Sequence, residues 1–562
     1  MLNRLFYNLS STIIIFVFTI FAISNIGFVF HLPVQSYYIY LSFMAAAIYL
    51  FFLNKNNRND YLKQIGIFVL LIYSAILFSS FLLDYSFDGL AYHFQDMYLL
   101  KNGWNPVYTD ATTFSHLMNL YSNQVWVQGW SKFCEIVSAN FYLISGSISS
   151  GQIVNFLMAY AAFMSVFCGL DKLQNKTNMN LLFSVLLLIN PVVIGQIFTM
   201  YIDLQVYFAF LIILSILIQI EKSDTFSINN YFIFSLVFTI FMHVKFSAFF
   251  YLLIISTLYF IYLLYLKKYL NIKRYFASGL LGLFLTIVLG AHPFYTNYHS
   301  YGHPFYPLLG KHKQDVIERQ ITIIELKNKT SVQKAIMSTF AVQTNYPGHI
   351  EYRLPFKIKK ISLYESDTRI GGMGHFWSGI LIISLIFSFG IRYNTKEDKS
   401  IFIMMFSTIW LSYLFYPDPW WMRYVPQIWI FPVLVLYLSL NYGNSLFLDK
   451  NYIKQFYVVF MTLLLLSNSL IVTYENQSLT LEQQKERISF YKMLSYVNNG
   501  VLIYPLKDAA EGNSSIYAYL DKYNVKYSIV SDKDYYKNKS AYEPMELFSV
   551  FKKTYFWKKA EE

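Results

Sequence analysis

The chain has 562 residues, of which 56% are hydrophobic, 20% are aromatic and only 14% are charged. A water-soluble fold cannot hide so much apolar surface, and many runs match the roughly 20 apolar residues that cross a bilayer. The net charge of +12 does not indicate nucleic-acid binding, because Lys and Arg lie mostly in short segments between apolar runs. We therefore predict a polytopic membrane protein.

The apolar segments, in chain order, predict about thirteen transmembrane helices. The first lacks a small-residue cleavage site, so we expect a retained helix and not a removed signal peptide. The run from Tyr231 to Leu266 is too long for one span, so we expect a tight hairpin near His243 and Lys245. The predicted segments are residues 10–30, 37–53, 64–83, 151–170, 181–198, 203–220, 229–243, 246–266, 275–291, 374–391, 401–416, 422–440 and 455–474.

The charges of the short loops predict the orientation, because Lys and Arg in such loops stay on the cytoplasmic side. With the N-terminus inside, the external short loops carry almost no positive charge, and Lys245 and Arg423 are the exceptions. The two cysteines, Cys134 and Cys168, then lie on opposite sides of the membrane, and no disulfide is expected. Three long segments are predicted outside: residues 84–150, 292–373 and 475–562.

The predicted fold is an all-α polytopic membrane protein with external loop helices and a small C-terminal α/β domain. Residues 1–474 form the transmembrane module, and residues 475–562 form an external accessory domain. In this tail, VLIYPL and YSIVSD are typical of strands. The segment SSIYAYLDKYN between them has helical spacing after a serine cap.

The first candidate site follows the third predicted helix, in LDYSFDGLAYHFQDMYLL. A helix starting at Phe87 would place Asp88, Tyr92, His93 and Asp96 on one polar face. Such a helix would lie flat at the outer membrane surface, where a carboxylate can be tuned as a base. The alternative is a polar face that simply contacts water. Acidic and histidine residues on one helix are common by chance, so we predict no metal and no cofactor.

Three further charged residues lie at predicted external helix ends. Asp203 in MYIDLQV lies at the outer end of a predicted transmembrane helix, where a carboxylate is costly unless it faces a charged partner or a polar cavity. An ordinary helix-end residue is an equally good interpretation. Lys245 in MHVKFSA suits an anionic ligand such as a phosphate, or is a lysine that snorkels to the interface. Arg423 in DPWWMRYVPQ can bind a phosphate through two nitrogens, and the aromatic belt explains the tryptophans but not this arginine.

Six motifs in this order resemble the bacterial polytopic glycosyltransferases of the C-type (GT-C) superfamily, related to the polyprenyl-phosphate-sugar transferases. They are SFDGLAYH, NPVVIGQIFTMYIDL, VKFSAFFY, YGHPFYP, TRIGGMGHFW and DPWWMRYVPQ, within residues 64 to 440. The sequence departs from the superfamily pattern at the first motif. Many members have adjacent acidic residues there, whereas Asp84 and Asp88 are four positions apart.

The resemblance implies a transferase that takes a sugar from a polyprenyl phosphate at the external face of a bacterial inner membrane. The acceptor would be a hydroxyl on a glycan, lipid or protein. Asp88 would be the general base of an inverting displacement. Cations near the outer boundary would stabilise the leaving phosphate, and the candidates for substrate binding are Tyr92, His93, Asp96, Asp203, Lys245, Arg369 and Arg423.

Two other functions stay open at this point. An O-antigen polymerase or ligase also has many helices and a large external loop. The enzymes of that group, however, typically have arginine-rich external loops and use a diphosphate-linked donor. A transporter or flippase of lipid-linked sugars would place ionisable residues near the bilayer midplane and would have two similar halves. The sequence shows charges at the outer helix ends and no paired halves.

Overall fold

The computed structural model describes most of residues 2–496 and a few short pieces of the tail. The residues it leaves undescribed are 1, 81, 83, 85, 87, 115–123, 224–226, 315–322, 344–348, 358–365, 444 and 448–449, and, after residue 496, all except 502–505, 526–530, 537, 542–544 and 557–559.

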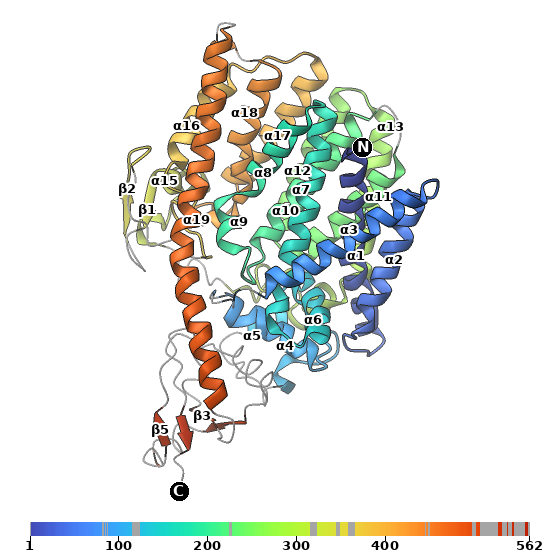
Figure 1. The fold of residues 1–562 in the computed structure, drawn as a ribbon, viewed down its shortest axis with the longest axis vertical. Coiled ribbons are helices and arrows are strands. Elements are labelled where there is room, and N and C mark those ends of the chain that lie inside the picture. The colour runs from blue at the N-terminus through green and yellow to red at the C-terminus, as the bar shows by residue number, and fades with distance from the viewer. Residues whose placement is uncertain are drawn as a thin grey trace.

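The described chain is a bundle of long helices that run side by side (Figure 1). Helices α7, α10 and α11 pack at its centre, and α1 packs against α7 and α2. The bundle helices are α1 (Leu2–Val29), α2 (Tyr37–Leu53), α3 (Arg58–Ser79), α7 (Ile153–Leu173), α8 (Thr177–Leu188), α10 (Asp203–Glu221), α11 (Ile228–Val244), α12 (Ala248–Tyr265), α13 (Tyr269–Leu289), α16 (Trp377–Ser388), α17 (Lys396–Leu414), α18 (Ile430–Asn441) and α19 (Asn451–Tyr496).

Seven helices of the described chain are long and apolar enough to cross a membrane, and several shorter apolar helices lie beside them. The outer helices leave large apolar side chains exposed, such as Phe284 at 60% and Phe456 at 71%. Such a surface suits lipid and not water. The chain is a multi-pass, essentially all-helical membrane protein, as predicted.

Every predicted apolar segment contains a helix, but some boundaries differ. The segment predicted at residues 181–198 is split into α8 and the short α9 (Pro191–Gln196). Asn190 causes the split, because its side chain caps the backbone N–H of Val192 and Pro191 cannot continue a preceding helix. The predicted hairpin near Lys245 is confirmed, since α11 ends at Val244 and α12 begins at Ala248. The number of spans stays a prediction.

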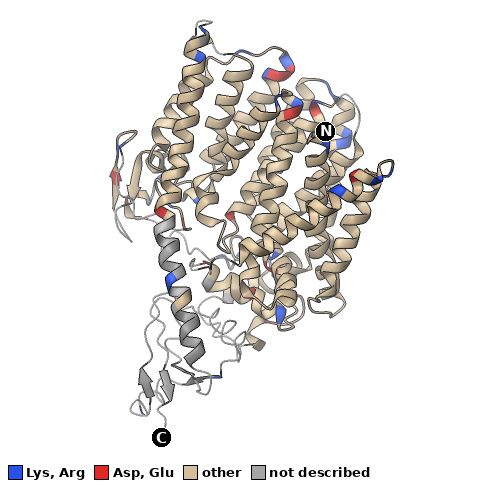
Figure 2. Ribbon diagram, in the orientation of Figure 1, with Lys and Arg blue, Asp and Glu red and all other residues tan. Residues whose placement is uncertain are grey.

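Charged side chains join the helix ends that lie on the same side as the N-terminus. Lys222 pairs with Asp398 at 2.5 Å, and Lys268 pairs with Glu221 at 2.9 Å. Many Lys and Arg residues lie in loops near this end of the bundle (Figure 2). This distribution supports the predicted cytoplasmic side. Asp203, Lys245 and Arg423 lie at the opposite ends of their helices.

We expect cysteine labelling to show this orientation directly. Asn328→Cys should react with an impermeant thiol reagent added from outside, whereas Lys267→Cys and Lys396→Cys should react only after permeabilisation. The natural thiols Cys134 and Cys168 are free but buried, so the background should be low. Labelling of the two lysine positions from outside, with Asn328→Cys protected, would reverse the topology.

The end of the bundle that is predicted to be external is covered by short helices and one small hairpin. Helices α4 (Phe94–Lys101) and α6 (Phe133–Ser145) pack against each other, and the sequence did not predict α6. Strands β1 (Ala341–Gln343) and β2 (Ile350–Tyr352) form an antiparallel pair. The remaining short helices are α5 (Gln124–Gly129), α14 (Thr296–Tyr301) and α15 (Ser331–Phe340).

The last helix is longer than predicted, because α19 continues to Tyr496 and not to residue 474. It extends beyond the bundle toward the tail (Figure 1). The two predicted strand runs correspond to β3 (Leu502–Pro505) and β4 (Tyr527–Val530), which pair in parallel. Strands β5 (Tyr542–Pro544) and β6 (Trp557–Lys559) complete a sheet of order β4-β3-β6-β5. The helix predicted between β3 and β4 lies outside the described residues.

Candidate functional site

The centre of the candidate site is Arg423, whose guanidinium lies among three carboxylates. Its Nη1 is 2.8 Å from Oδ2 of Asp88 and 3.1 Å from Oδ2 of Asp203. Its Nε is 2.9 Å from Oδ1 of Asp367. Arg423 is only 4% exposed. We call these four residues, together with Lys245 and Arg369, the charged cluster.

Helix ends and loops from distant parts of the sequence form the charged cluster. Asp203 is the first residue of α10, and Arg423 lies in a short helical turn, Met422–Tyr424, before α18. The backbone N–H of Arg423 donates to the carbonyl of Thr368 at 3.1 Å, which joins this turn to the loop that carries Asp367. These contacts bring Asp88, Asp203 and Arg423 together in one place.

Lys245 is the second cation and lies between α11 and α12. Its Nζ donates to Oδ1 of Asp203 at 2.5 Å. Burial lowers the pKa of Lys245 and Arg423 lowers it further, while Asp203 opposes both effects. Asp203 also accepts from Nε2 of Gln196 at 3.4 Å. Asp203 is thus a buried anchor that holds both cations, not a plain helix-end residue.

Arg369 is the third cation and binds Asp367 through two nitrogens. Its Nε and Nη2 lie 3.0 Å and 2.8 Å from Oδ2 of Asp367. The indole N–H of Trp421 donates to Oδ1 of the same carboxylate at 2.6 Å. The guanidinium of Arg369 also lies over the Trp421 ring, 4.8 Å from its centre.

Aromatic rings surround the cations of the cluster. The guanidinium of Arg423 lies 4.4 Å from the ring centre of Tyr201, 4.7 Å from that of Trp421 and 4.9 Å from that of Tyr424. The ammonium of Lys245 lies 4.1 Å from the ring centre of Tyr424. Negative ring faces stabilise positive charge in a dry site. Sugar rings commonly stack on such aromatic faces as well, so the surroundings suit a sugar phosphate.

Tyr92 also faces the charged cluster. Burial raises the pKa of the Tyr92 phenol, and the charge of Asp88 raises it further. Tyr201 behaves in the same way, because burial and then Asp88 and Asp367 raise its pKa. Both phenols therefore remain protonated at neutral pH and can donate hydrogen bonds.

The charges of Arg423 and its partners are balanced within the cluster. Burial opposes the charge of Arg423, but Tyr424 and the carboxylates Asp88, Asp367 and Asp203 outweigh it and hold its pKa above the usual value. The side chains of Asp88 and Asp367 are 14% and 17% exposed, whereas that of Asp203 is 3% exposed. Asp88 and Asp367 are thus the more accessible carboxylates of the cluster.

Asp84 holds the loop that carries Asp88. It is buried and accepts the backbone N–H of Ser86 and of Met200, each at 2.7 Å. Burial raises the pKa of Asp84 to about 6, although these hydrogen bonds favour the ionised carboxylate and oppose the shift. A Cβ at Gly89 would lie 2.0 Å from an Asp84 oxygen, so this position requires glycine. Asp84 fixes the start of the turn, and Asp88 alone of the two reaches Arg423.

The alternative interpretation of the helix after Asp88, a polar face in contact with water, does not hold for His93 and Asp96. His93 is 2% exposed and pairs with Glu135, and Asp96 is 1% exposed and pairs with Lys132 at 2.6 Å. Burial raises the pKa of Asp96, and Lys132 opposes this shift. Their partners come from α6 and the residue before it, so these side chains join α4 to α6. They do not join the charged cluster.

Three residues of the site were missed from the sequence: Gln196, Tyr201 and Asp367. Asp367 had a signal, because it lies two positions before Arg369 in a segment rich in glycine. Gln196 and Tyr201 lie within the motif NPVVIGQIFTMYIDL, but nothing in the sequence distinguishes them from their neighbours there. Within the described residues, no group of three or more His, Cys, Asp or Glu side chains is arranged to hold a metal ion.

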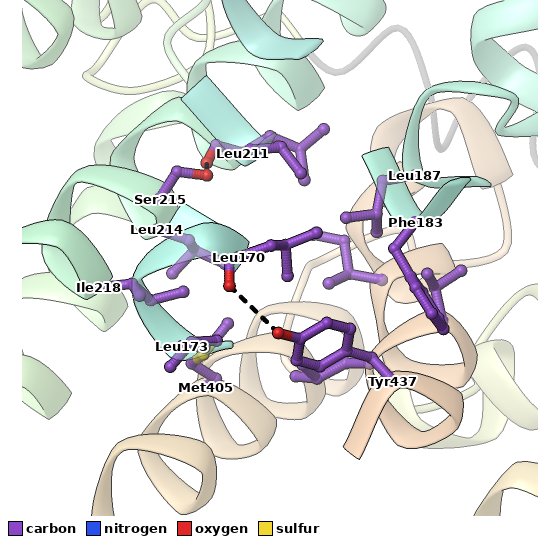
Figure 3. Close-up of a pocket in the computed structure, with 14 residues that line it drawn as sticks. Leu170, Leu173, Phe183, Leu187, Leu211, Leu214, Ser215, Ile218, Met405 and Tyr437 are labelled. Carbon is purple, nitrogen blue, oxygen red and sulfur yellow. Dashed lines mark hydrogen bonds between the residues drawn. The ribbon is translucent and has the colours of Figure 1, made fainter. Parts of the chain in front are cut away.

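A cavity between helices of the bundle is separate from the charged cluster. Its volume is about 40 Å³, and its lining includes Leu170, Leu187, Leu214 and Tyr437 (Figure 3). The Tyr437 hydroxyl donates to the Leu170 carbonyl at 3.2 Å across it. The lining carries no charged group, so we place no chemistry there.

Comparisons with known proteins give little beyond the general course of the chain. No protein-family model matches, and no curated protein is detectably similar in sequence. A crystal structure of ArnT from Cupriavidus metallidurans bound to undecaprenyl phosphate is similar, with a TM-score of 0.48 and 9% identity. The match covers 88% of this chain and 98% of that chain. This score is too low to carry an argument, so function is argued from the charged cluster.

Proposed function

We propose that the chain is a membrane glycosyltransferase that moves a sugar from a polyprenyl phosphate to an acceptor hydroxyl, with inversion, on the external face. The observation that carries the proposal is the contact between Asp88 and Arg423. A partly exposed carboxylate lies 2.8 Å from a buried guanidinium. The proposal takes Asp88 as the base and Arg423 as the phosphate-binding cation, because the two lie side by side.

Each group has a defined part in the proposed reaction. Asp88 takes the proton of the acceptor hydroxyl while the oxygen of that hydroxyl forms a bond to the anomeric carbon of the sugar. The bond between that carbon and the phosphate oxygen breaks, and the lipid phosphate leaves with the electron pair. Arg423, Lys245 and Arg369 stabilise the negative charge that grows on the phosphate.

The cluster is suited to this reaction because its cations are fixed before substrate arrives. Asp203 holds Lys245 and Arg423 together through its two oxygens. Preorganised cations in a partly dry site stabilise developing charge without reorganisation. Tyr92 and Tyr201 supply phenolic donors beside the same space. His93 and Asp96, in contrast, act through the packing of α4.

The direct test supplies the purified protein with a panel of polyprenyl-phosphate sugars and an acceptor mixture. We expect release of the free lipid phosphate with at least one sugar. Release that depends on the acceptor, and product of inverted anomeric configuration, would establish the reaction class.

The same assay separates the two alternatives. A polymerase or ligase of the O-antigen type would act on the diphosphate-linked donor and leave monophosphate donors intact. A flippase would move the intact lipid between leaflets of a vesicle and release no lipid phosphate. Either result would exclude the proposed transferase.

A further inference from the structure

Nitrogen groups of Arg369, Trp421 and Arg423 surround the carboxylate of Asp367. Its carboxylate accepts two hydrogen bonds from Arg369 and one from the Trp421 indole N–H, at 3.0 Å, 2.8 Å and 2.6 Å. It also lies 2.9 Å from Nε of Arg423. Guanidinium forks bind carboxylates and phosphates through the same planar geometry. Donors that hold Asp367 therefore also suit the oxygens of a phosphate.

We propose that Asp367 is the resident counter-ion of the phosphate site, and that the donor phosphate binds by displacing it from Arg369 and Arg423. This inference rests on the proposed function and names a role for a residue that the reaction itself does not use. Asp367 is a positioning residue, because it keeps the empty site neutral and contacts no reacting atom.

The side chain of Asp367 is more exposed than that of Asp203. The side chain of Asp203 is 3% exposed and lies at the start of α10, between Lys245 and Arg423. The side chain of Asp367 is 17% exposed and lies in a loop. The Nε–H of Arg423 is buried and forms no hydrogen bond, although Oδ1 of Asp367 is near it. A phosphate oxygen placed in line with the Nε–H bond of Arg423 would accept the hydrogen bond that this group does not form with Asp367.

The phosphate site survives the departure of Asp367. Arg423 stays attached to Asp88 and Asp203 through Nη1, and its backbone N–H stays bonded to Thr368. The Arg369 guanidinium still has the Trp421 ring beneath it. The cations thus keep their places while the carboxylate moves out and the phosphate moves in.

Neutralising Asp367 should therefore strengthen phosphate binding. The cluster has three carboxylates and three cations, and Asp367→Asn leaves two carboxylates with three cations. Asparagine keeps the size and an oxygen that accepts from Trp421. Removal of one unit charge about 4 Å from the anion, even at the dielectric constant of water, predicts at least about fivefold tighter binding.

The experiment measures the dissociation constant of undecaprenyl phosphate for the full chain in detergent. Asp418→Asn is the matched control, because Asp418 pairs with Lys334 at 2.9 Å and accepts the Trp420 indole N–H at 3.1 Å. Its side chain is 19% exposed, close to the value for Asp367. We expect tighter binding for Asp367→Asn and no change for Asp418→Asn. The gain should shrink as salt is added, because screening weakens exposed charges.

Two additional ligands identify what the site recognises. Undecaprenol, which lacks the phosphate, should bind all variants equally. If inorganic phosphate shows the same gain as the lipid phosphate, the site recognises the phosphate group alone. If only the lipid phosphate shows it, the lipid chain is needed to deliver the group. Both results support displacement of Asp367.

Other outcomes overturn the inference. Weaker binding by a folded Asp367→Asn, or by the second variant Asp367→Ser, would show that Asp367 holds the arginines for the phosphate and does not compete with it. An equal gain in Asp418→Asn would reveal a general charge effect. If the wild-type protein binds no lipid phosphate at all, the proposed function fails. If the wild type binds and only the gain is missing, the proposed function stands without this inference.

Discussion

Asp88→Asn is expected to lower the rate of sugar transfer by at least about 10², while the donor still binds. Asparagine has the size of aspartate and keeps an oxygen that can accept from Nη1 of Arg423, but it cannot take the acceptor proton. The measurement compares single-turnover transfer with the dissociation constant of undecaprenyl phosphate. The loss should lie in the chemical step.

The position of Asp88 makes this result specific. Its side chain is 14% exposed, so its replacement leaves no large buried cavity and should change thermal stability little. Asp418→Asn serves again as the control for loss of an external carboxylate, with transfer expected to be unchanged. Near-normal turnover in Asp88→Asn would remove this residue from the mechanism. Asp84 would not be a replacement base, because its oxygens are engaged by Ser86 and Met200.

The helices of the bundle could be predicted because each one needs a long apolar run, and such runs are visible in one dimension. The break near Lys245 was predictable for the same reason, since no single span fits the run from Tyr231 to Leu266. The split between α8 and α9 was not predicted, although Asn190 and Pro191 form a capping pair that marks a helix start.

The candidate site was predictable where a charge violated a membrane rule. Lys245 and Arg423 stood out because external short loops otherwise carry almost no cation, and Asp203 stood out by its depth. His93 and Asp96 show the opposite case. Helical spacing placed them on a polar face, but only a second helix decides whether that face meets water, and Lys132 and Glu135 cover it. Pairing between distant segments leaves no signal in one sequence.

Asp367 was missed for a related reason. An acidic residue in a loop is ordinary, and its meaning comes from Arg423 and Trp421, which lie far from it in the sequence. Loops and helix ends carry the residues of the charged cluster, whereas the apolar runs only fix where the helices end. Sequence reasoning thus singled out Asp88, Asp203, Lys245, Arg369 and Arg423 of the charged cluster but not Asp367.

Arg423→Lys is expected to lower transfer at least about tenfold, with a smaller change in thermal stability. Lysine keeps the positive charge but loses the fork, so it cannot contact Asp88, Asp203 and a phosphate at once. The affinity for undecaprenyl phosphate should fall together with the transfer rate, because Arg423 is proposed to bind the phosphate before and during bond cleavage. Arg423→Ala should abolish most transfer.

The alanine variant alone would be ambiguous, because it leaves the buried Asp203 with fewer partners. Removing one member of a buried ion pair costs about 3–5 kcal/mol of folding stability. We therefore pair Arg423→Gln with Asp203→Asn, which removes one charge of each sign and keeps both side chains polar. This double variant should regain part of the thermal stability that Arg423→Gln loses, because Asp203→Asn also removes the carboxylate partner of Lys245.

Transfer should not return with stability in the double variant, because the phosphate has lost the arginine that is proposed to bind it. Thermal unfolding in detergent and the release of lipid phosphate, measured on the same preparations, separate the two effects. If the double variant were both stable and active, Arg423 would be a structural counter-ion of the carboxylates. The phosphate would then have to be held by Lys245 and Arg369 alone, and Arg369→Gln should in that case cause the loss of affinity that is expected here of Arg423→Lys.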